Sequence, residues 1–394
     1  MPNKGKPVRA KSKPRHASNR KKNKRVSSIN PDSLIRKASP AKPEEVTLHR
    51  EVKSLPLDHR LIRNITHKGF KQLTQIQDGS LEFQLEGKDV LGIAKTGTGK
   101  TGAFLIPLIQ RLLVENKNRK TLILVPTREL AVQVEEEFNS LAKKLPMRAI
   151  CVIGGTSVNR DIQRLRERPQ LVIGTPGRVQ DLIVRKALRL KSYNGLILDE
   201  FDRMLDMGFV KEVMGIARGM VHRDQTVLFS ATVNDKQKPS IDELLKNPEM
   251  VRTTSGKETS DHIEQQVIRI KPNENKFSVL LNLIQQDEYE KVLVFAETKS
   301  WVKRITSKLR KSGIDVDEIH GNKTQNYRIR ALNKFRRGEL QVLAATDVAA
   351  RGIDVDDVTH VINYQMPMDM DSYIHRIGRT GRAGKQGKAV TLVD

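Results

Sequence analysis

The sequence predicts an α/β protein with two successive doubly wound parallel sheets, preceded by a disordered basic tail. Three observations predict it. The chain has 394 residues, more than one hydrophobic core usually organises. After residue 50, short apolar runs alternate with longer amphipathic stretches, as expected for strands that helices cover on both faces of a sheet. A polar stretch without periodicity at residues 251–262 interrupts this alternation and is typical of a linker.

The start of the chain holds much of the positive charge. Residues 1–50 carry 15 Lys/Arg against 3 Asp/Glu, within a net charge of +25 for the whole chain. Residues 1–31 contain no acid and almost no large apolar residue, so they bury too little surface to offset the entropy of ordering. We expect residues 1–44 to be disordered. Such a polycation binds nucleic-acid phosphates without reading sequence, although it could instead only keep the chain soluble. The run RKKNKR could also be a nuclear localisation signal.

Composition excludes several classes of protein. No apolar run approaches the roughly 18–20 residues that span a bilayer, so no membrane span is expected. No apolar stretch of roughly 7–15 residues follows the basic start, which excludes a secretory signal. The single cysteine, Cys151, excludes an intramolecular disulfide and a cysteine-based zinc site, and its apolar surroundings predict burial. A cytoplasmic location is expected, and the basic tail leaves nucleus or nucleoid open.

The predicted strands are short, and most of them are strongly apolar. In the first half they are DVLGIA (89–94), TLILVP (121–126), RAICVIGG (148–155), QLVIGT (170–175), GLILDE (195–200) and QTVLFSAT (225–232). In the second half they are EQQVIRI (264–270), KVLVFAE (291–297), DVDEIHG (315–321), LQVLAAT (340–346), THVINYQ (359–365) and KAVTLV (388–393). Stretches with helical spacing of apolar residues separate them. We expect one domain over residues 45–250 and another over residues 263–394.

The run AKTGTGKT has the spacing of a phosphate-binding loop, except that Ala94 stands where the strict pattern has glycine. It follows a predicted strand and leads into a predicted helix, as such a loop requires. Gly97 and Gly99 allow backbone N–H groups to point at phosphate oxygens. Lys100 supplies a charge for the terminal phosphates, and Thr101 offers a hydroxyl to Mg²⁺. The alternative is a structural turn that is rich in glycine and threonine.

Two adjacent carboxylates end a strongly apolar strand in LILDEFD. Asp199 and Glu200 would lie at the carboxyl edge of the sheet, where a parallel sheet presents its ligand. There Asp199 would hold Mg²⁺, partly through water, and Glu200 would orient or deprotonate the attacking water. Acids also favour the start of a helix, which accounts for Asp202 but not for two carboxylates at a strand end. Together the two motifs predict a site that hydrolyses a magnesium nucleoside triphosphate.

These motifs belong to an ordered set over roughly residues 50–394 that resembles the DEAD-box RNA helicases of superfamily 2. In chain order the matches are GFKQLTQIQ, AKTGTGKT, PTREL, GG, TPGR, DEFD, SAT, LVFAET, QNYR, ATDVAARGID and HRIGRTGRAG. The resemblance implies that both domains are RecA-like. It also accounts for Ala94, because the family's phosphate loop begins with alanine.

Three features depart from the pattern of that family. The name motif has Phe201 where the family has alanine. In LTQIQ, Leu73 and Gln75 stand where the family typically has prolines. Val52 falls about where the family often has an isolated aromatic residue.

The resemblance implies roles on both halves of the nucleotide site. Gln77 and Phe70 would recognise adenine, one by hydrogen bonds and the other by stacking, so ATP would be preferred over GTP. Arg379 and Arg382 resemble the family's arginine fingers, and Asp354 resembles its ribose contact. The alternative for RIGRTGR is a basic loop on a solvated face. The expected catalytic residues are Lys100, Asp199, Glu200, Arg379 and Arg382. The expected nucleotide-binding residues, with ATP and Mg²⁺ as cofactors, are Phe70, Gln77, Ala94, Lys95, Thr96, Gly97, Thr98, Gly99, Lys100, Thr101 and Asp354.

The resemblance also implies RNA contacts on both halves. Their residue types suit sugar and phosphate rather than bases, and only 4% of the chain is aromatic, so binding independent of sequence is expected. The segments PTREL and TPGR could also be only strand ends followed by helix starts. The expected RNA contacts are Arg128, Gly155, Thr175, Arg178, Thr298, Gln325, Arg328 and Thr346. The residues expected to couple hydrolysis to domain closure are Asp202, Ser230, Thr232 and His375.

The function that the resemblance implies is an ATP-dependent RNA helicase that binds the RNA backbone and locally separates short duplexes. ATP and RNA would close the two domains, and hydrolysis would reopen them. Two alternatives remain open. One is an RNA-stimulated ATPase that remodels RNA–protein complexes, and the other is a basic RNA-annealing or RNA-binding protein with a weak ATPase. The expected partners are single-stranded RNA or a short duplex and ribonucleoproteins, and the chain is expected to be a monomer.

Overall fold

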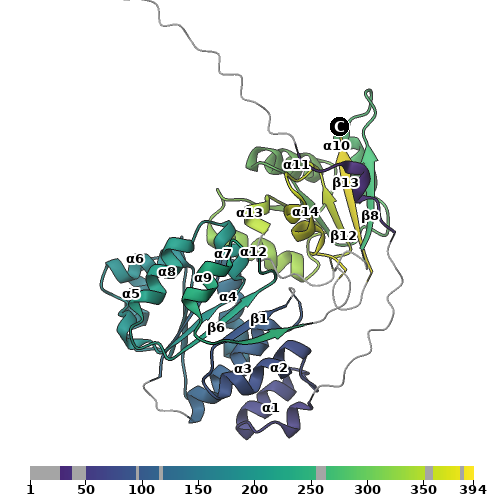
Figure 1. Cartoon of the computed structure of the whole chain (residues 1–394). Coiled ribbons are helices and arrows are strands. Elements are labelled where there is room, and N and C mark those ends of the chain that lie inside the picture. Colours follow the sequence, from purple (N-terminus) through teal and green to yellow (C-terminus); the bar gives the residue numbers. More distant parts are fainter. Residues whose placement is uncertain are drawn as a thin grey trace, which may run out of the picture.

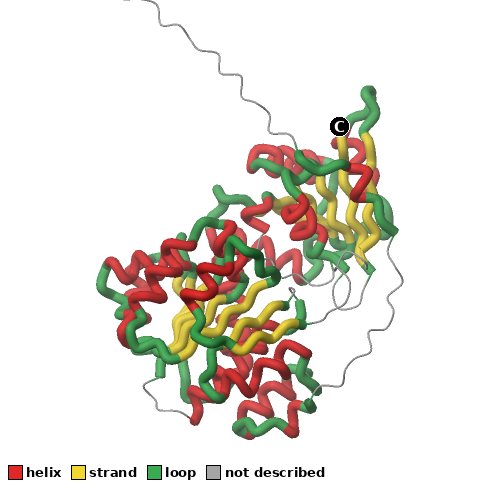
Figure 2. The backbone as a smooth tube through the Cα atoms, viewed as in Figure 1, coloured by secondary structure: helices red, strands yellow, loops and turns green. Residues whose placement is uncertain are grey.

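The computed structural model describes residues 27–37, 50–94, 97–114, 119–253, 263–350, 358–381 and 386–394. Two sheets flanked by helices follow one another along the chain (Figures 1 and 2). The first has strand order β3-β4-β2-β5-β6-β1-β7, and the second has order β10-β11-β9-β12-β13-β8. Every strand pairing in both sheets is parallel. The predicted α/β class with two doubly wound parallel sheets is confirmed. We call the parts around these sheets the first and the second domain.

The strands of the first sheet are the apolar centres of the predicted runs. They are β1 (Val90–Ile93), β2 (Thr121–Leu124), β3 (Ala149–Val152), β4 (Leu171–Gly174), β5 (Gly195–Leu198) and β6 (Gln225–Ser230). β7 (Glu249–Arg252) lies outside the predicted strands and pairs with β1 at the edge of the sheet. Its residues alternate between half-buried and exposed, so it lacks the continuous apolar run of a central strand. The expected start of the linker at residue 251 is therefore wrong, because that residue belongs to a strand.

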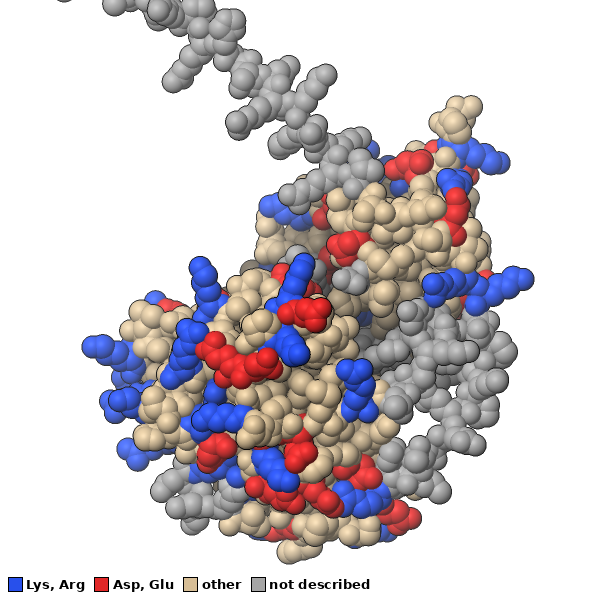
Figure 3. All heavy atoms as spheres, viewed as in Figure 1, with Lys and Arg blue, Asp and Glu red and all other residues tan. Residues whose placement is uncertain are grey.

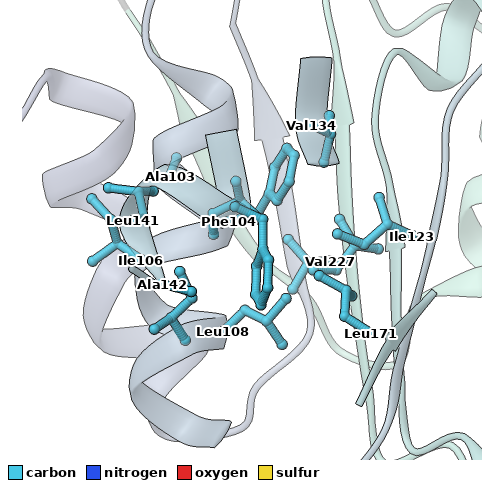
Figure 4. Packing of buried hydrophobic residues seen from close by; sticks show 14 of the residues in the cluster. Ala103, Phe104, Ile106, Leu108, Ile123, Val134, Leu141, Ala142, Leu171 and Val227 are labelled. Atoms are coloured by element: carbon cyan, nitrogen blue, oxygen red, sulfur yellow. The ribbon is translucent and has the colours of Figure 1, made fainter. Parts of the chain in front are cut away.

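Helices cover both faces of the first sheet (Figure 1). The helices on one face are α1 (His59–His67), α2 (Gln75–Leu85), α3 (Lys100–Val114) and α4 (Arg128–Leu141). Those on the other face are α5 (Val158–Arg166), α6 (Pro176–Val184), α7 (Phe201–Asp206), α8 (Val210–Gly219) and α9 (Lys238–Leu244). Figure 4 shows the first core around Phe104, which packs between the helices and the sheet. Burying a side chain of this kind contributes about 1.5–3 kcal/mol.

The departures from the family pattern are accommodated in the cores of the first domain. The Phe201 ring is fully buried in the α5–α9 core. Val52, in a short 3₁₀ turn (Val52–Ser54), and Leu73 are buried in the α1–α4 core. The Leu73 N–H donates to the Arg50 carbonyl at 3.1 Å, which ties this segment together. Gln75 is the first residue of α2. The larger ring at position 201 thus adds apolar surface to the core.

The second domain repeats the arrangement. Its strands are β8 (Ile263–Arg269), β9 (Val292–Phe295), β10 (Val316–Ile319), β11 (Val342–Ala345), β12 (His360–Asn363) and β13 (Gly387–Val393). One face carries α10 (Lys276–Ile284) and α11 (Lys299–Lys311), and the other carries α12 (Gln325–Arg336) and α13 (Asp347–Ala350). The last helix, α14 (Met370–Ile377), packs over β8 and β13. All six strands overlap the runs that the sequence predicts.

Part of the predicted disordered tail is ordered. Residues 27–37 lie against the second domain and contain a 3₁₀ turn, η1 (Pro31–Leu34). Leu34 is buried, and Arg36 forms an antiparallel bridge with Gln265 of β8. The expectation of disorder over residues 1–44 is therefore wrong for this stretch. The stretch is ordered because it packs against a surface of the second domain, which local composition does not reveal. The rest of the predicted tail lies outside the described residues.

The structure bears on the single cysteine and on the possibility of a membrane span. Cys151 is buried on β3, and burial raises the pKa of its thiol. No helix in the described part of the chain has both the length and the apolar character that a bilayer crossing requires.

A buried histidine makes the stability of the second domain depend on pH. His360 on β12 is 3% exposed and stacks on Tyr289, with ring centroids 3.8 Å apart. Burial lowers the pKa of His360 from 6.5 to about 4, so the folded chain favours the neutral ring. In the unfolded chain the imidazole of His360 takes up a proton with the ordinary pKa of 6.5. The stabilisation is therefore complete above about pH 6.5 and is lost as the pH falls toward 4.

We expect the free energy of unfolding to fall by about 2 kcal/mol between pH 7 and pH 5 because of His360 alone. Urea unfolding of the second domain, followed in the full chain at both pH values, measures this loss. The His360→Phe variant keeps a ring for the stack on Tyr289 but takes up no proton, so its loss should be smaller. An equal loss in both proteins would contradict the assignment to His360.

Candidate functional site

The predicted nucleotide residues of the first domain meet at one edge of its sheet. Strands β5, β6 and β1 are neighbours, and DEFD, SAT and AKTGTGKT follow their carboxyl ends. The Ala94 N–H donates to the Ser230 carbonyl at 3.0 Å, which joins the start of the phosphate loop to SAT. Because parallel strands end at the same edge, motifs far apart in the chain form one site.

The phosphate loop requires glycine at two positions. Gly97 and Gly99 have φ of 84° and 90°, in the left-handed region that glycine adopts without strain. A Cβ on Gly99 would also lie 2.7 Å from Gln77 Nε2. Thr101 follows in the first turn of α3 and is half-buried. Lys95 and Thr96 lie outside the described residues.

Gln77 connects the segment before α2 to the phosphate loop. Its Oε1 accepts from the Thr74 N–H at 2.9 Å, and its Nε2 donates to the Gly99 carbonyl at 3.0 Å. Phe70 is half-buried at the border of the α1–α4 core. Gln77 thus lies directly beside the phosphate loop. The recognition of adenine by both residues stays a prediction, and it requires the Gln77 amide to exchange these bonds.

Lys100 and Asp199 are buried next to each other. Lys100 Nζ donates to the Ala94 carbonyl at 2.8 Å. Asp199 is 2% exposed, and its Oδ1 accepts from the Glu200 N–H at 2.9 Å. Burial raises the pKa of Asp199 to about 6, and the charge of Lys100 opposes this rise. The site therefore holds a carboxylate that a further positive charge would stabilise.

Mg²⁺ with a triphosphate fits this donor set. The ion prefers hard oxygen ligands and usually takes one or two carboxylates together with phosphates. Asp199 supplies a buried carboxylate, and Thr101 supplies a hydroxyl from the first turn of α3. The described residues contain no group of three or more His, Cys, Asp or Glu that could hold a metal by itself. The phosphates would have to complete the ligand set.

Glu200 is held by a strained backbone and by an arginine. Its φ of 52° and ψ of 50° lie in the left-handed region that residues other than glycine rarely adopt. Its Oε2 accepts from Arg203 Nη1 at 2.7 Å, and both side chains are buried. Burial alone would raise the pKa of Glu200, but Arg203, Lys100 and Arg379 hold it below its usual range. The carboxylate therefore stays ionised, as a group that orients or deprotonates water must be.

Arg379 comes from the second domain, and its charge is one of those that lower the pKa of Glu200, so it lies within electrostatic range of this carboxylate. Arg379 is buried at the end of α14. Its proposed companion Arg382 and the proposed ribose contact Asp354 lie outside the described residues. The sequence did not single out Arg203 as a site residue. Its only signal is its position three residues after Glu200 on a short helix.

The predicted coupling residues form one connected region. Asp202 Oδ2 accepts from the N–H groups of Ala231 and Thr232 at 3.2 and 3.3 Å, which joins DEFD to SAT. Ser230 Oγ donates to the Thr232 carbonyl at 2.6 Å. His375 of the second domain is half-buried nearby, and burial lowers its pKa while Asp202 opposes that shift. Hydrogen bonds therefore join DEFD to SAT, and the charge of Asp202 acts on His375 of α14.

Arg376, between His375 and Arg379, holds the second domain together. Its Nε and Nη2 donate to the two carboxylate oxygens of Asp347 at 2.5 and 2.7 Å. Its Nη1 donates to Asn363 Oδ1 at 3.1 Å. Sequence alone does not separate this buried arginine from the proposed fingers, because all of them lie in one basic run.

Two of the predicted RNA residues of the first domain, Arg128 and Arg178, lie beside the GG motif. The Arg128 guanidinium lies so close to Gly155 that a Cβ there would be 2.5 Å from Arg128 Nη1. Thr175 precedes α6 and makes no capping hydrogen bond with its side chain. Arg178 is buried, where its Nη1 donates to Asp161 and its Nη2 donates to the Thr156 carbonyl at 2.9 Å. Arg178 therefore braces the loop after GG, and its contact with RNA stays a prediction.

Two predicted RNA residues of the second domain instead pair with Glu129 of PTREL. Gln325 Nε2 donates to Glu129 Oε1 at 2.8 Å, and Arg328 Nη2 lies 3.2 Å from Glu129 Oε2. Glu129 is buried and links the domains. The sequence did not single it out, since an acid in the first turn of a helix is already explained by the helix dipole. Thr298 caps α11 through the Trp301 N–H at 3.3 Å, and Thr346 is half-buried after β11.

Among the described residues, the visible surface shows no uniform basic patch that would indicate an RNA path. On the face shown in Figure 3, Lys and Arg are interspersed with Asp and Glu over the first domain. The candidate site is therefore defined by its buried side chains rather than by a uniform patch of charge on that face.

Comparison with known proteins assigns the family. Residues 74–240 match the model of the DEAD/DEAH box helicase family, and residues 275–384 match that of the helicase conserved C-terminal domain. The chain belongs to the DEAD-box helicases. It is 43% identical over 337 residues to the ATP-dependent RNA helicase CshA of Listeria monocytogenes, covering 86% of this chain and 65% of that one. It is 42% identical over 339 residues to CshA of Limosilactobacillus reuteri, covering 86% of this chain and 68% of that one. The chain thus spans about two thirds of the length of these relatives.

Solved structures of the family have the same architecture. Dbp5 of S. cerevisiae, bound to RNA and ADP BeF3, is 30% identical with a TM-score of 0.75, covering 87% of this chain and 89% of that one. Mss116p, bound to ssRNA and AMP-PNP, is 31% identical with a TM-score of 0.78, covering 89% of this chain and 76% of that one. The RecA-like character of the two domains is confirmed.

Proposed function

We propose that this chain is an ATP-dependent RNA helicase that hydrolyses ATP between its two domains and uses the cycle to separate short RNA duplexes. One observation carries the proposal: the two domains meet through Glu129, Gln325 and Arg328, with Arg379 of the second domain within electrostatic range of Glu200 of the first. A hydrolysis site completed by both domains makes turnover depend on their closure. The relatives named as ATP-dependent RNA helicases support this reading.

Each residue of the site would perform one task in hydrolysis. The N–H groups of the phosphate loop and Lys100 would bind the phosphates, and Glu200 would orient or deprotonate the attacking water. Arg379 would stabilise the charge that develops on the transferred phosphoryl group. Thr101 and Asp199 would hold Mg²⁺, which neutralises phosphate charge when bound. Arg203 holds the Glu200 carboxylate in place, which favours a single orientation of the water.

RNA would favour the same closed arrangement. The segments that Glu129, Gln325 and Arg328 join are PTREL and QNYR, which also carry proposed RNA contacts. A strand that touches both segments binds the closed state better than the open one, so RNA shifts the equilibrium toward closure. Asp202 and His375 would transmit closure to the hydrolysis site. The structures of Dbp5 and Mss116p with RNA support a shared RNA path.

The proposal extends to the domain boundaries, the cofactors, the oligomeric state and the location of the chain. The first functional unit would extend to the end of β7, the second would begin with β8, and a linker would connect them. RNA would be bound without sequence preference, with ATP and Mg²⁺ as cofactors. The chain would act as a monomer in the cytoplasm on RNA or ribonucleoproteins.

The first test is steady-state ATP hydrolysis with and without single-stranded RNA, with single-stranded DNA as the control. We expect RNA to stimulate turnover and DNA to do so much less. Strand displacement on a short RNA duplex is then measured with ATP and with a non-hydrolysable analogue. Stimulated turnover without displacement would favour the remodelling ATPase. Absence of turnover under all conditions would leave the RNA-binding alternative and reject the proposal.

A further inference from the structure

The segment before the first domain in sequence is attached to the second domain in space. Figure 1 shows η1 beside β8 and β13. Ser27 Oγ donates to the Pro367 carbonyl at 2.6 Å, and the Ser28 N–H donates to the Met368 carbonyl at 3.1 Å. These two carbonyls lie just before α14. Residues 27–36 are therefore bound next to the start of the helix that leads to the proposed arginine finger.

Local sequence turns one apolar side chain of this segment inward. Asn30 caps η1 by accepting from the Asp32 N–H at 3.1 Å, and Pro31 occupies the first position of the turn. As a result Leu34 is 2% exposed, whereas its neighbour Ile35 is 58% exposed. Of these two apolar neighbours, only Leu34 is therefore buried in the protein.

Leu34 fills the space between α14 and the edge of the second sheet. It shares a buried cluster with Ile263 of β8, Ala389 of β13, and Tyr373 and Ile377 of α14. Both α14 residues in this cluster are almost fully buried. Removing part of the Leu34 side chain would leave a gap on the side of α14 that faces the sheet.

The backbone of the segment reinforces this contact. The Arg36 N–H donates to the Gln265 carbonyl at 3.1 Å, and the Gln265 N–H donates to the Arg36 carbonyl at 2.8 Å. This pair covers part of the β8 edge. The Gln265 side chain in turn accepts from the Tyr373 hydroxyl at 3.0 Å. The segment therefore holds α14 through Leu34 directly and through Gln265 indirectly.

The position of α14 matters because it carries His375 and sets the position of Arg379, the two residues of the second domain that are proposed to act on the first. His375 lies on α14, and the Arg379 N–H donates to the Arg376 carbonyl at 3.2 Å directly after it. A displacement of about 1 Å in a group that acts on the reacting phosphate can cost on the order of a hundredfold in rate.

We propose that Leu34 is a positioning residue for ATP hydrolysis: residues 27–36 act as part of the second domain, and Leu34 holds α14 so that Arg379 reaches the phosphates beside Glu200. The inference rests on the proposed function. It assigns to this segment a task separate from RNA tethering.

The test compares Leu34→Ala with its neighbour Ile35→Ala in the full chain. At saturating ATP and RNA, and at a temperature where both variants are folded, Leu34→Ala should lower kcat by roughly tenfold to a hundredfold. The KM for ATP should change little, since the adenine and phosphate-loop residues lie on the first domain. Ile35→Ala should leave kcat unchanged, and Leu34→Met, which restores volume, should recover most of it. Equal kcat values for Leu34→Ala and Ile35→Ala would overturn the proposal.

A double-mutant cycle separates positioning from a merely structural role. If Leu34 acts through Arg379, Leu34→Ala should have little further effect on kcat in the Arg379→Lys background. An undiminished effect there would overturn the proposal. Hydrogen exchange of the α14 amides gives a readout that needs no catalysis, and Leu34→Ala alone should accelerate it. If the wild type hydrolyses no ATP, the proposed function fails. If Leu34→Ala leaves the hydrogen exchange of the α14 amides unchanged, Leu34 does not hold α14 and the positioning proposal is rejected on its own.

Discussion

Replacing Glu200 with glutamine is expected to lower kcat for RNA-stimulated ATP hydrolysis by about 10²–10⁴, the usual contribution of a general base. The amide has the same shape but cannot take a proton from water. Lys100, Thr101 and Asp199 remain in place, so the affinity for ATP should change little. Steady-state kinetics measures kcat, and equilibrium binding of a non-hydrolysable ATP analogue measures the affinity.

The environment of Glu200 sharpens this prediction. Arg203 Nη1 donates to the buried carboxylate, and glutamine would keep an oxygen acceptor for that bond. The variant should therefore fold, with a loss of about 1–3 kcal/mol because an ion pair becomes a hydrogen bond from a charged arginine to a neutral amide oxygen. The control is Glu136→Gln, an exposed position on α4. A kcat within a few-fold of wild type for Glu200→Gln would mean that another group activates the water.

Replacing Arg379 with alanine is expected to lower kcat by about 10³–10⁵, the range for an arginine finger. Arg379→Lys should recover only part of this loss, since a lysine offers a point charge without the planar pair of donors. Because Arg379 would contact the phosphates only from the second domain, the binding of ATP to the first domain should be retained. Single-turnover hydrolysis with RNA at saturation measures the chemical step.

Loss of Arg379 should also change the dependence of hydrolysis on pH. Arg379 is one of the groups that hold the pKa of Glu200 below its usual range, although Arg203 and Lys100 contribute more. Without it the pKa of Glu200 rises, so the acidic limb of the kcat profile should move to higher pH. Arg304→Ala, at an exposed position on α11, is the control for removal of a positive charge. An unshifted limb would place Arg379 away from Glu200 in the active state.

The nucleotide half of the site was predictable from the sequence because its information is local. An apolar strand, a loop with Gly97 and Gly99, and the helix that starts at Lys100 are consecutive in the chain. The acids Asp199 and Glu200 follow another apolar strand in the same way. Once the strands are known to be parallel, these ends must meet at one edge. The strand β7 gave no such signal, because it is short, half-exposed and at the edge.

The contacts between the domains were not predictable in this way. Glu129 meets Gln325 and Arg328 although nearly two hundred positions separate them in the chain, and no periodic pattern marks a polar pair. Arg178 was expected to contact RNA, yet in the interior its guanidinium pairs with Asp161. Burial of a polar group requires a partner, but the sequence does not say which partner the fold supplies.

The sequence by itself determined the class of the protein, the number of sheets, and the residue types of the hydrolysis site, because strand periodicity and loop chemistry depend on neighbours in the chain. The tertiary structure alone decided that Arg203 and Arg379 act on Glu200, that Glu129 joins the domains, and that Leu34 belongs to the second domain. These features depend on burial and on charges brought together from distant segments. Such effects act through space and leave no trace in local composition.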